Sequence, residues 1–282
     1  MFFRNVVALM LLLASGGSIA NIGIPFFKSA LVVGNNQYPY LELKNGVSDA
    51  ALIAQELRQN GFEVTTVYET DRAALLNSLK QFVVSTRSNI GVSETAVVYL
   101  SGAGYHCNGE DFFIPNISGA KPANKKSQPV QQMLEQAVPL QQIREQLDGM
   151  ARKLILIFDA GRVATDAKCK RPFATPQLKS HWLNVYSSAP GEVALDGDVN
   201  SPFAAALAKW LKRTDLTALD VFQNVADDVW QNTQYKQRVQ IDSLIPYRIH
   251  LCQRGSCQPA PAPQEMPAAN SEAQPAIESK ER

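Results

Sequence analysis

Histidine is scarce in this 282-residue sequence, and charge of either sign is not in excess. Three histidines are present, at His106, His181 and His250, and 27 Lys and Arg face 26 Asp and Glu for a formal net charge of +1. So few imidazoles limit the number of histidine-dependent mechanisms that the chain can support. A nucleic-acid-binding protein needs a basic face or a recognised binding motif, and the sequence shows neither. We therefore expect no nucleic-acid partner.

Several common active-site motifs are also missing. The sequence has no phosphate-binding loop of the G-x-x-x-x-G-K-[ST] type, no H-E-x-x-H zinc helix and no G-x-S-x-G nucleophile elbow. His250 with Cys252 and Cys257 has poor spacing and too few ligands for zinc. Glu110 and Asp111 are a weak calcium signal, and we favour their interpretation as two solvated loop carboxylates. We expect neither a metal ion nor another cofactor.

The N-terminus has the features of a targeting segment. Arg4 provides a positive charge, Val6–Ala14 is apolar, and Ser18-Ile19-Ala20 fits a signal-peptidase cleavage site. The apolar run is shorter than the roughly 20 residues that span a bilayer. We expect residues 1–20 to be a signal peptide and the mature protein to be periplasmic or secreted, without stable membrane insertion. An uncleaved signal anchor is the alternative.

The four cysteines fit an exported protein. An even number of cysteines in an oxidising compartment predicts disulfides, and four cysteines allow three connectivities. Cys252 and Cys257 are separated by four residues that can form a turn. Cys107 and Cys169 lie far from each other in the sequence, so their pairing depends on the fold.

Apolar runs and helical periodicity alternate along the chain, which predicts an α/β fold with a mostly parallel sheet and helices on both faces. We assign residues 21–257 to one domain, with an irregular insertion loop at about residues 107–138, and residues 258–282 to a disordered tail rich in Pro, Ala and Gln. The predicted strands are Ser29–Gly34, Phe62–Tyr68, Thr95–Leu100, Lys153–Phe158, Leu183–Ser187 and Leu244–Leu251. The predicted helices begin near Ser48, Asp71, Leu140, Ser201 and Asp220.

Two glycine-containing loops follow two of these strands. Ser101-Gly102-Ala103-Gly104 comes after Thr95–Leu100, and Asp159-Ala160-Gly161-Arg162 comes after Lys153–Phe158. Ligands of open α/β sheets bind outside the carboxyl ends of the strands. The sequence therefore predicts a functional site where these two loops meet.

The order of these motifs resembles that of the caspase-like cysteine peptidases, in particular the bacterial members related to metacaspases. Leu43–Ala50 resembles the family's L-K-N-x-x-x-D-A segment, Val98–Gly104 resembles the strand that ends in Y-x-S-G-H-G, and Ile157–Arg162 resembles the strand that ends in D-A-C-R. The resemblance extends over about Ser29–Leu251. It implies a caspase-like three-layer fold, with the reaction centre between the ends of two neighbouring strands.

The departures from the family pattern concern the reactive residues. Ala103 stands where the resemblance places the catalytic His, and Gly161 stands where it places the Cys. The family's reaction needs a thiolate nucleophile and an imidazole that moves protons. Loss of one member of a comparable triad costs about 10⁴- to 10⁶-fold in rate. We therefore predict no catalytic residue at these two positions, although backbone donors near Gly102 and Gly161 could still bind an oxyanion.

Other residues of the two loops keep possible binding roles. The resemblance implies that Asp159 accepts a Lys or Arg side chain of a peptide, whereas an Asp at a strand end can also accept hydrogen bonds from the following turn. Gly102 and Arg162 are further candidates for peptide binding, and structural ion pairing is the alternative for Arg162. Asp49 is expected near a helix N-terminus, where a negative charge is favourable.

The same resemblance implies that Cys107 and Cys169 lie close enough to form a disulfide, because each follows one of the two loops. We therefore predict an exported pseudopeptidase that binds a peptide or protein partner without cleaving it. One alternative is an active cysteine endopeptidase that cleaves after basic residues with relocated catalytic residues, such as Cys107 or Cys169 with His106. The other is a structural or interaction module with a vestigial cleft.

Overall fold

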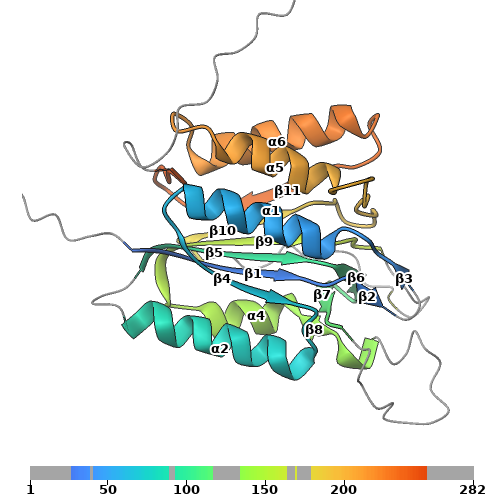
Figure 1. Cartoon of the computed structure of the whole chain (residues 1–282), viewed down its shortest axis with the longest axis horizontal. Coiled ribbons are helices and arrows are strands. Elements are labelled where there is room, and N and C mark those ends of the chain that lie inside the picture. The colour runs from blue at the N-terminus through green and yellow to red at the C-terminus, as the bar shows by residue number, and fades with distance from the viewer. Residues whose placement is uncertain are drawn as a thin grey trace, which may run out of the picture.

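A central β-sheet lies between two layers of helices in the computed structural model (Figure 1). The structure describes residues 27–38, 41–88, 93–116, 134–163, 169 and 179–252. The predicted signal peptide and the predicted C-terminal tail both lie outside these residues. The domain boundaries at residues 20 and 257 therefore stay predictions.

The central sheet is mostly parallel, as the sequence predicts. Its strand order is β11-β10-β9-β5-β1-β4, and all neighbouring pairs are parallel except β10 with β11. Continuous Val-, Ile- and Leu-rich runs form its middle strands, because both faces of a parallel sheet are buried. The strands are β1 (Lys28–Gly34), β4 (Glu63–Tyr68), β5 (Ser93–Ser101), β9 (Ala151–Asp159), β10 (Trp182–Tyr186) and β11 (Gln240–Ser243).

The helices form the two outer layers. On one face, α1 (Gly46–Gln59), α5 (Pro202–Leu211) and α6 (Ala218–Asn232) pack on the sheet; α2 (Arg72–Ser88) and α4 (Leu140–Leu147) cover the other (Figure 1). Each interface has its own apolar cluster. This arrangement confirms the predicted α/β fold with helices on both faces.

Capping side chains set the helix starts. Asp71 accepts a hydrogen bond from the backbone N–H of Ala74 at 2.8 Å, and Ser201 caps α5 in front of Pro202, both as predicted. The predicted start of α1 at Ser48 is wrong, since the helix begins at Gly46 with Asn45 as its N-cap. The Asn45 side chain donates instead to the carbonyl groups of Asp196 and Gly197, so a distant loop holds this end of the helix.

A small antiparallel sheet stands at the carboxyl end of the central strands. It consists of β6 (Ala103–Cys107), β7 (Glu110–Ile114) and β8 (Val138–Pro139), in that order (Figure 1). The predicted irregular loop at residues 107–138 is therefore wrong at both ends, while residues 117–133 lie outside the described part. The overlooked signal is Asn108-Gly109, with φ values of 53° and 90°, which is a preferred two-residue hairpin turn. A second short hairpin pairs β2 (Gln37–Tyr38) with β3 (Leu41–Glu42).

The last strand lies earlier in the chain than predicted. The more polar β11 pairs antiparallel with β10, whereas the apolar run Leu244–Leu251 forms no strand. This run contains Pro246, which has no backbone N–H to donate. The carbonyl of Ile249 accepts the backbone N–H of Ala218 at 2.6 Å, so this segment packs against the start of α6.

Candidate functional site

The two predicted loops meet at the carboxyl ends of β5 and β9. Ser101 pairs in register with Asp159, and the backbone N–H of Gly102 donates to the carbonyl of Asp159 at 3.3 Å. A cavity of about 180 Å³ opens at this edge of the sheet. Among the candidate residues, Gly102, Ala103, Asp159 and Gly161 line the cavity, together with Leu41, Leu43, Gly46, Asp49, Ser101, Gly104, Val163, Val193, Ala194, Leu195, Asp196 and Ser201.

Tyr38 holds Ala103 in place at the first position of β6. The Tyr38 hydroxyl accepts the backbone N–H of Ala103 at 3.0 Å and donates to the carbonyl of Ile114 at 2.9 Å. A Cβ atom at Gly102 would lie 2.5 Å from the same hydroxyl oxygen, and Gly102 has a φ of +156°. Glycine is therefore required immediately before Ala103.

Gly104 and Gly161 differ in the space around them. A Cβ atom at Gly104 would lie 2.6 Å from Cζ of Phe158, so β6 approaches the end of β9 too closely for a side chain there. A Cβ atom at Gly161 would lie 3.6 Å from the nitrogen of Ala194 and 3.7 Å from Cα of Val193, which are ordinary contacts. The backbone at Gly161 can therefore carry a side chain that the sequence does not supply.

Two buried carboxylates line the cavity. Asp159 Oδ2 accepts the hydroxyl of Tyr99 at 2.6 Å and that of Ser201 at 3.2 Å. Asp49 Oδ1 accepts Nδ2 of Asn200 at 2.8 Å and the backbone N–H of Ser201 at 3.0 Å. Asp49 lies in the first turn of α1, as expected, but the sequence did not predict that its side chain faces the cavity.

The two carboxylates affect each other's ionisation. Burial raises the pKa of Asp49 to about 7, and the neighbouring charge of Asp159 acts in the same direction. Burial also raises the pKa of Asp159. Among the ion pairs of the described residues, none joins either carboxylate to a Lys or Arg. A cationic group in the cavity would therefore relieve an unfavourable burial of negative charge.

Asp196 is a third carboxylate at the cavity wall. Its oxygens accept the backbone N–H groups of Lys44 and Asn45 at 2.7 and 3.2 Å. These bonds connect the loop before α5 to the N-terminus of α1. The family-like segment Leu43–Ala50 thus contributes both to the structure of the wall and, through Asp49, to its charge.

Arg162 lies outside the cavity, although it belongs to the same loop as Gly161. Its Nε and Nη2 atoms bind the two carboxylate oxygens of Asp111 at 3.0 and 2.8 Å, and its Nη1 binds Oε1 of Gln240 at 2.6 Å. The guanidinium carbon is 4.1 Å from the ring centroid of Tyr186. These contacts agree with the structural interpretation of Arg162, which ties the exit of β9 to the β6–β7 hairpin and to β11.

His106 also belongs to this buried cluster. Its Nδ1 lies 2.9 Å from Oδ1 of Asp111, and its Nε2 accepts the backbone N–H of Gly109 at 3.2 Å. The side chain is buried and does not line the cavity. His106 is thus part of the hairpin's packing and is directed to Asp111.

The cysteines of the described residues are oxidised. Cys107 forms the predicted disulfide with Cys169, over a sequence separation of 62. Cys252 is also in a disulfide, and Cys257, the cysteine nearest to it in the sequence, lies outside the described residues. The described part of the chain therefore has no free thiol.

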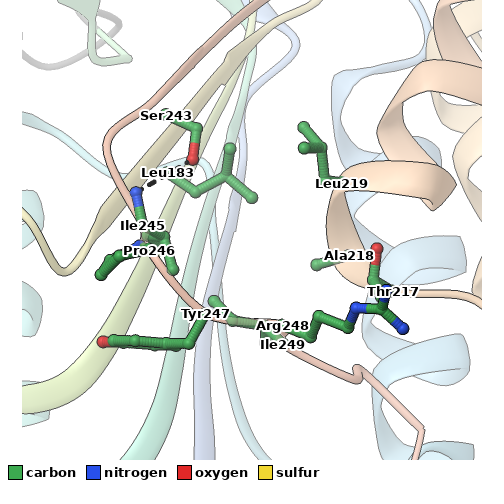
Figure 2. A pocket seen from close by; sticks show the side chains of 10 residues that line it. All are labelled: Leu183, Thr217, Ala218, Leu219, Ser243, Ile245, Pro246, Tyr247, Arg248 and Ile249. Carbon is green, nitrogen blue, oxygen red and sulfur yellow. Dashed lines mark hydrogen bonds between the residues drawn. The ribbon is translucent and has the colours of Figure 1, made fainter.

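A second cavity, of about 250 Å³, lies at the opposite end of the sheet. Figure 2 shows its side chains coming from the start of β10, the end of β11 with the following segment, and the start of α6. Its hydroxyl groups serve local structure, since Thr217 caps α6 with Asp220 and Ser243 accepts the backbone N–H of Ile245 (Figure 2). The two loops with the candidate site residues line the cavity at the ends of β5 and β9 and not this one.

Among the residues that the structure describes, no group of three or more His, Cys, Asp or Glu side chains is placed to hold a metal ion. In the same residues, no helix combines the length and the apolar character that crossing a membrane requires.

The family model of the caspase domain matches residues 28–248, which is more than half of the chain. The chain belongs to the caspase domain family. This caspase domain has its candidate site where the sequence resemblance placed the reaction centre, at the ends of two neighbouring strands. A search of the curated proteins found no match.

Proposed function

We propose that this caspase domain is an exported pseudopeptidase, which binds a peptide or protein partner in the cavity at the ends of β5 and β9 and does not cleave it. The proposal rests mainly on one observation. Ala103 and Gly161 line the same cavity, and the carboxylates of Asp49 and Asp159 line it as well. Ala103 offers a methyl group and Gly161 no side chain where the family resemblance places an imidazole and a thiol. The site can therefore bind a ligand through its carboxylates, but Ala103 and Gly161 supply neither a nucleophile nor a base for covalent catalysis.

The other histidines and cysteines support this proposal by their positions. His106 is held by Asp111, and Cys107 is bonded to Cys169. His181 lies 3.8 Å from Asp148, and His250 bonds the carbonyl of Leu216. None of these side chains is part of the cavity lining in the described residues. Cysteine peptidase chemistry needs a free thiol and an imidazole within reach of each other.

The acidic floor supports a Lys or Arg side chain as the group that enters the cavity. The hydroxyls of Tyr99 and Ser201 bind Asp159, and these donors come from other elements and not from the turn that follows β9. Neutral donors satisfy part of the hydrogen-bonding capacity of Asp49 and Asp159 without compensating their charge. A partner's ammonium or guanidinium group supplies that compensation and forms charge-assisted hydrogen bonds.

Export is supported by the N-terminal sequence and by the disulfide between Cys107 and Cys169, because structural disulfides persist in oxidising compartments. The active-peptidase alternative requires a relocated thiol, and the described cysteines are all bonded. The interaction-module alternative predicts that partner binding does not change when a bulky side chain blocks the cavity in a Gly161→Trp variant.

The test uses the purified exported protein with fluorescent peptides that contain Arg or, as a matched comparison, Gln. We expect binding of the Arg peptide, measured by fluorescence anisotropy, with no cleavage products by mass spectrometry. Asp159→Asn abolishes the preference for Arg, whereas Asp215→Asn, which changes a carboxylate outside the cavity, does not. Peptide turnover that disappears on mutation of Cys107 or His106 would refute the pseudopeptidase assignment.

A further inference from the structure

We propose that the partner's basic residue is flanked by large aliphatic residues two positions away on either side, and that these pack on an exposed apolar rim of the same cavity. This inference rests on the proposed function and extends it to the chemistry around the basic side chain. The apolar rim consists of Leu41, Val163 and Val193, which all line the cavity.

The rim residues are exposed despite their apolar character. The exposed fractions are 41% for Leu41, 37% for Val163 and 54% for Val193. They come from three separate segments: strand β3, the exit of β9, and the loop between β10 and α5. Single exposed apolar residues are normal on a protein surface, but several around one concave site are typical of a binding surface.

Backbone hydrogen bonds hold the rim in position. The carbonyl of Val163 accepts the backbone N–H of His106 at 3.1 Å, which fixes Val163 beside β6. Leu41 is paired with Tyr38 in the β2–β3 hairpin. Two reciprocal backbone bonds, Arg162 N–H to Glu192 at 2.9 Å and Gly191 N–H to Arg162 at 3.1 Å, place the Val193 loop against the exit of β9. A preformed rim binds a ligand with a smaller entropy cost than a mobile one.

The charge distribution selects the kind of ligand. Carboxylates form the floor through Asp49 and Asp159, and the apolar side chains stand at the exposed border. A purely apolar ligand would leave the buried carboxylates unpaired, and an isolated cation would leave the rim uncovered. A peptide with a central Lys or Arg and aliphatic neighbours matches both parts of the cavity.

The geometry of an extended peptide determines the positions of the flanks. Side chains alternate between the two faces of an extended chain, so residues two positions apart lie on the same face, about 7 Å from each other. When the basic side chain enters the cavity, the residues two positions before and after it face the rim. The immediate neighbours face away from it.

The experiment compares three labelled peptides on the intact protein: acetyl-Gly-Leu-Gly-Arg-Gly-Leu-Gly-amide, the same peptide with both Leu replaced by Gly, and the same peptide with Arg replaced by Gln. We expect the Leu-flanked Arg peptide to bind about tenfold more tightly than the Gly-flanked one, from the apolar area that the rim buries. Each of Leu41→Ser, Val163→Ser and Val193→Ser reduces this ratio by about threefold.

Val84→Ser is the matched control, because Val84 is 60% exposed on α2 and does not line the cavity. We expect it to leave the ratio unchanged. The Gly-flanked Arg peptide reports whether each rim variant keeps an intact floor, and its affinity should stay the same. A ratio near one in the wild type, or rim variants that weaken both Arg peptides equally, would overturn the inference about the rim.

The outcomes separate this inference from the proposed function. If Arg peptides bind better than Gln peptides but the flanks have no effect, the rim inference fails and basic recognition stands. If the Leu-flanked Gln peptide binds as tightly as its Arg counterpart and depends on the rim, the rim stands and basic recognition fails. If no peptide binds, both fail.

Discussion

Asp49 and Asp159 are bridged by one residue, Ser201, whose backbone N–H donates to Asp49 at 3.0 Å and whose hydroxyl donates to Asp159 at 3.2 Å. Asp49 belongs to α1 and Asp159 to β9, and the two residues are 110 positions apart in the sequence. Ser201 also caps α5, so the same residue starts a helix and organises the acidic floor. Burial raises the pKa of both carboxyl groups.

The first prediction concerns the pH dependence of stability. Burial raises the pKa of Asp49 from 3.8 to about 7 in the folded protein. Between these two values the folded state binds more protons at this group than the unfolded state, so the free energy of unfolding decreases as pH rises from about 4 to 7. We expect Asp49→Asn to remove about 2–4 kcal/mol of this decrease, measured by urea unfolding at pH 5 and pH 8.

The control for this experiment is Asp215→Asn, because this carboxylate is exposed and paired with Arg213 at the surface. It should leave the pH profile close to that of the wild type. A wild-type unfolding free energy that rises steadily between pH 5 and pH 8, with no difference from Asp49→Asn, would contradict the prediction.

The second prediction concerns the pH dependence of binding. Protonation of Asp49 removes a negative charge from the floor of the cavity. At pH values below the raised pKa of Asp49, a cationic side chain therefore binds with a less favourable free energy. We expect an Arg peptide to bind about tenfold more weakly at pH 6 than at pH 8. Titration calorimetry in buffers of different ionisation enthalpy should detect proton release at neutral pH. An affinity that is unchanged between these two pH values would disprove the linkage.

The third prediction concerns the two positions where the family resemblance places reactive side chains. The space at Gly161 admits a Cβ atom at ordinary contact distances, and Ala103 lines the same cavity. We expect the double variant Ala103→His/Gly161→Cys to hydrolyse an Arg-aminomethylcoumarin substrate at least about tenfold faster than the wild type, since the triad-type chemistry supplies many orders of magnitude in rate.

The two single variants are the matched controls for this double variant, and neither should gain comparable activity. The Gly161→Cys variant should also react with iodoacetamide, because the added thiol lies at the wall of a cavity that is open to solvent. A thiol at this position that resists alkylation in the folded protein would show that the cavity is closed to ligands.

The fourth prediction concerns the buried ion pair between Arg162 and Asp111. Removal of either partner leaves the other charge buried without compensation, which costs about 3–5 kcal/mol of unfolding free energy. Arg162→Lys should also destabilise the protein, because an ammonium group cannot replace the two-atom contact with the carboxylate or the stacking on Tyr186. Urea unfolding measures each variant.

The exposed pair Arg213–Asp215 provides the comparison, since Arg213→Ala removes a salt bridge at the surface and should have little effect. Equal effects of Arg162→Ala and Arg213→Ala would mean that the buried pair does not contribute to folding.

Much of the fold could be predicted because its signals are local. The continuous apolar runs of β1, β5 and β9 indicate buried parallel strands, and Asp71 and Ser201 with Pro202 mark helix starts by their own hydrogen-bonding and conformational preferences. The disulfide between Cys107 and Cys169 followed from the family resemblance, which places the two loops side by side.

The errors occur where distant contacts outweigh local preference. Helix α1 begins at Gly46, ahead of Ser48, and the side chain of the preceding Asn45 binds the carbonyl groups of Asp196 and Gly197 in a distant loop instead of capping the helix. The polar β11 forms a strand because the edge of β10 pairs with it, while the more apolar segment after it packs on α6. Asn108-Gly109 is the exception, since that turn signal was present in the sequence and was overlooked.

The sequence by itself determined the buried parallel strands and the helices between them, and it placed Ala103 and Gly161 where the family resemblance expects reactive side chains, because these features follow from local patterns and from residue identity. Only the tertiary structure decided which groups surround those positions. In the folded chain Asp49 lines the cavity, whereas Arg162 and His106 bind Asp111 outside it. The fold also places Leu41, Val163 and Val193 around the same cavity. The physical reason is that charge compensation and side-chain packing depend on neighbours that are distant in the sequence.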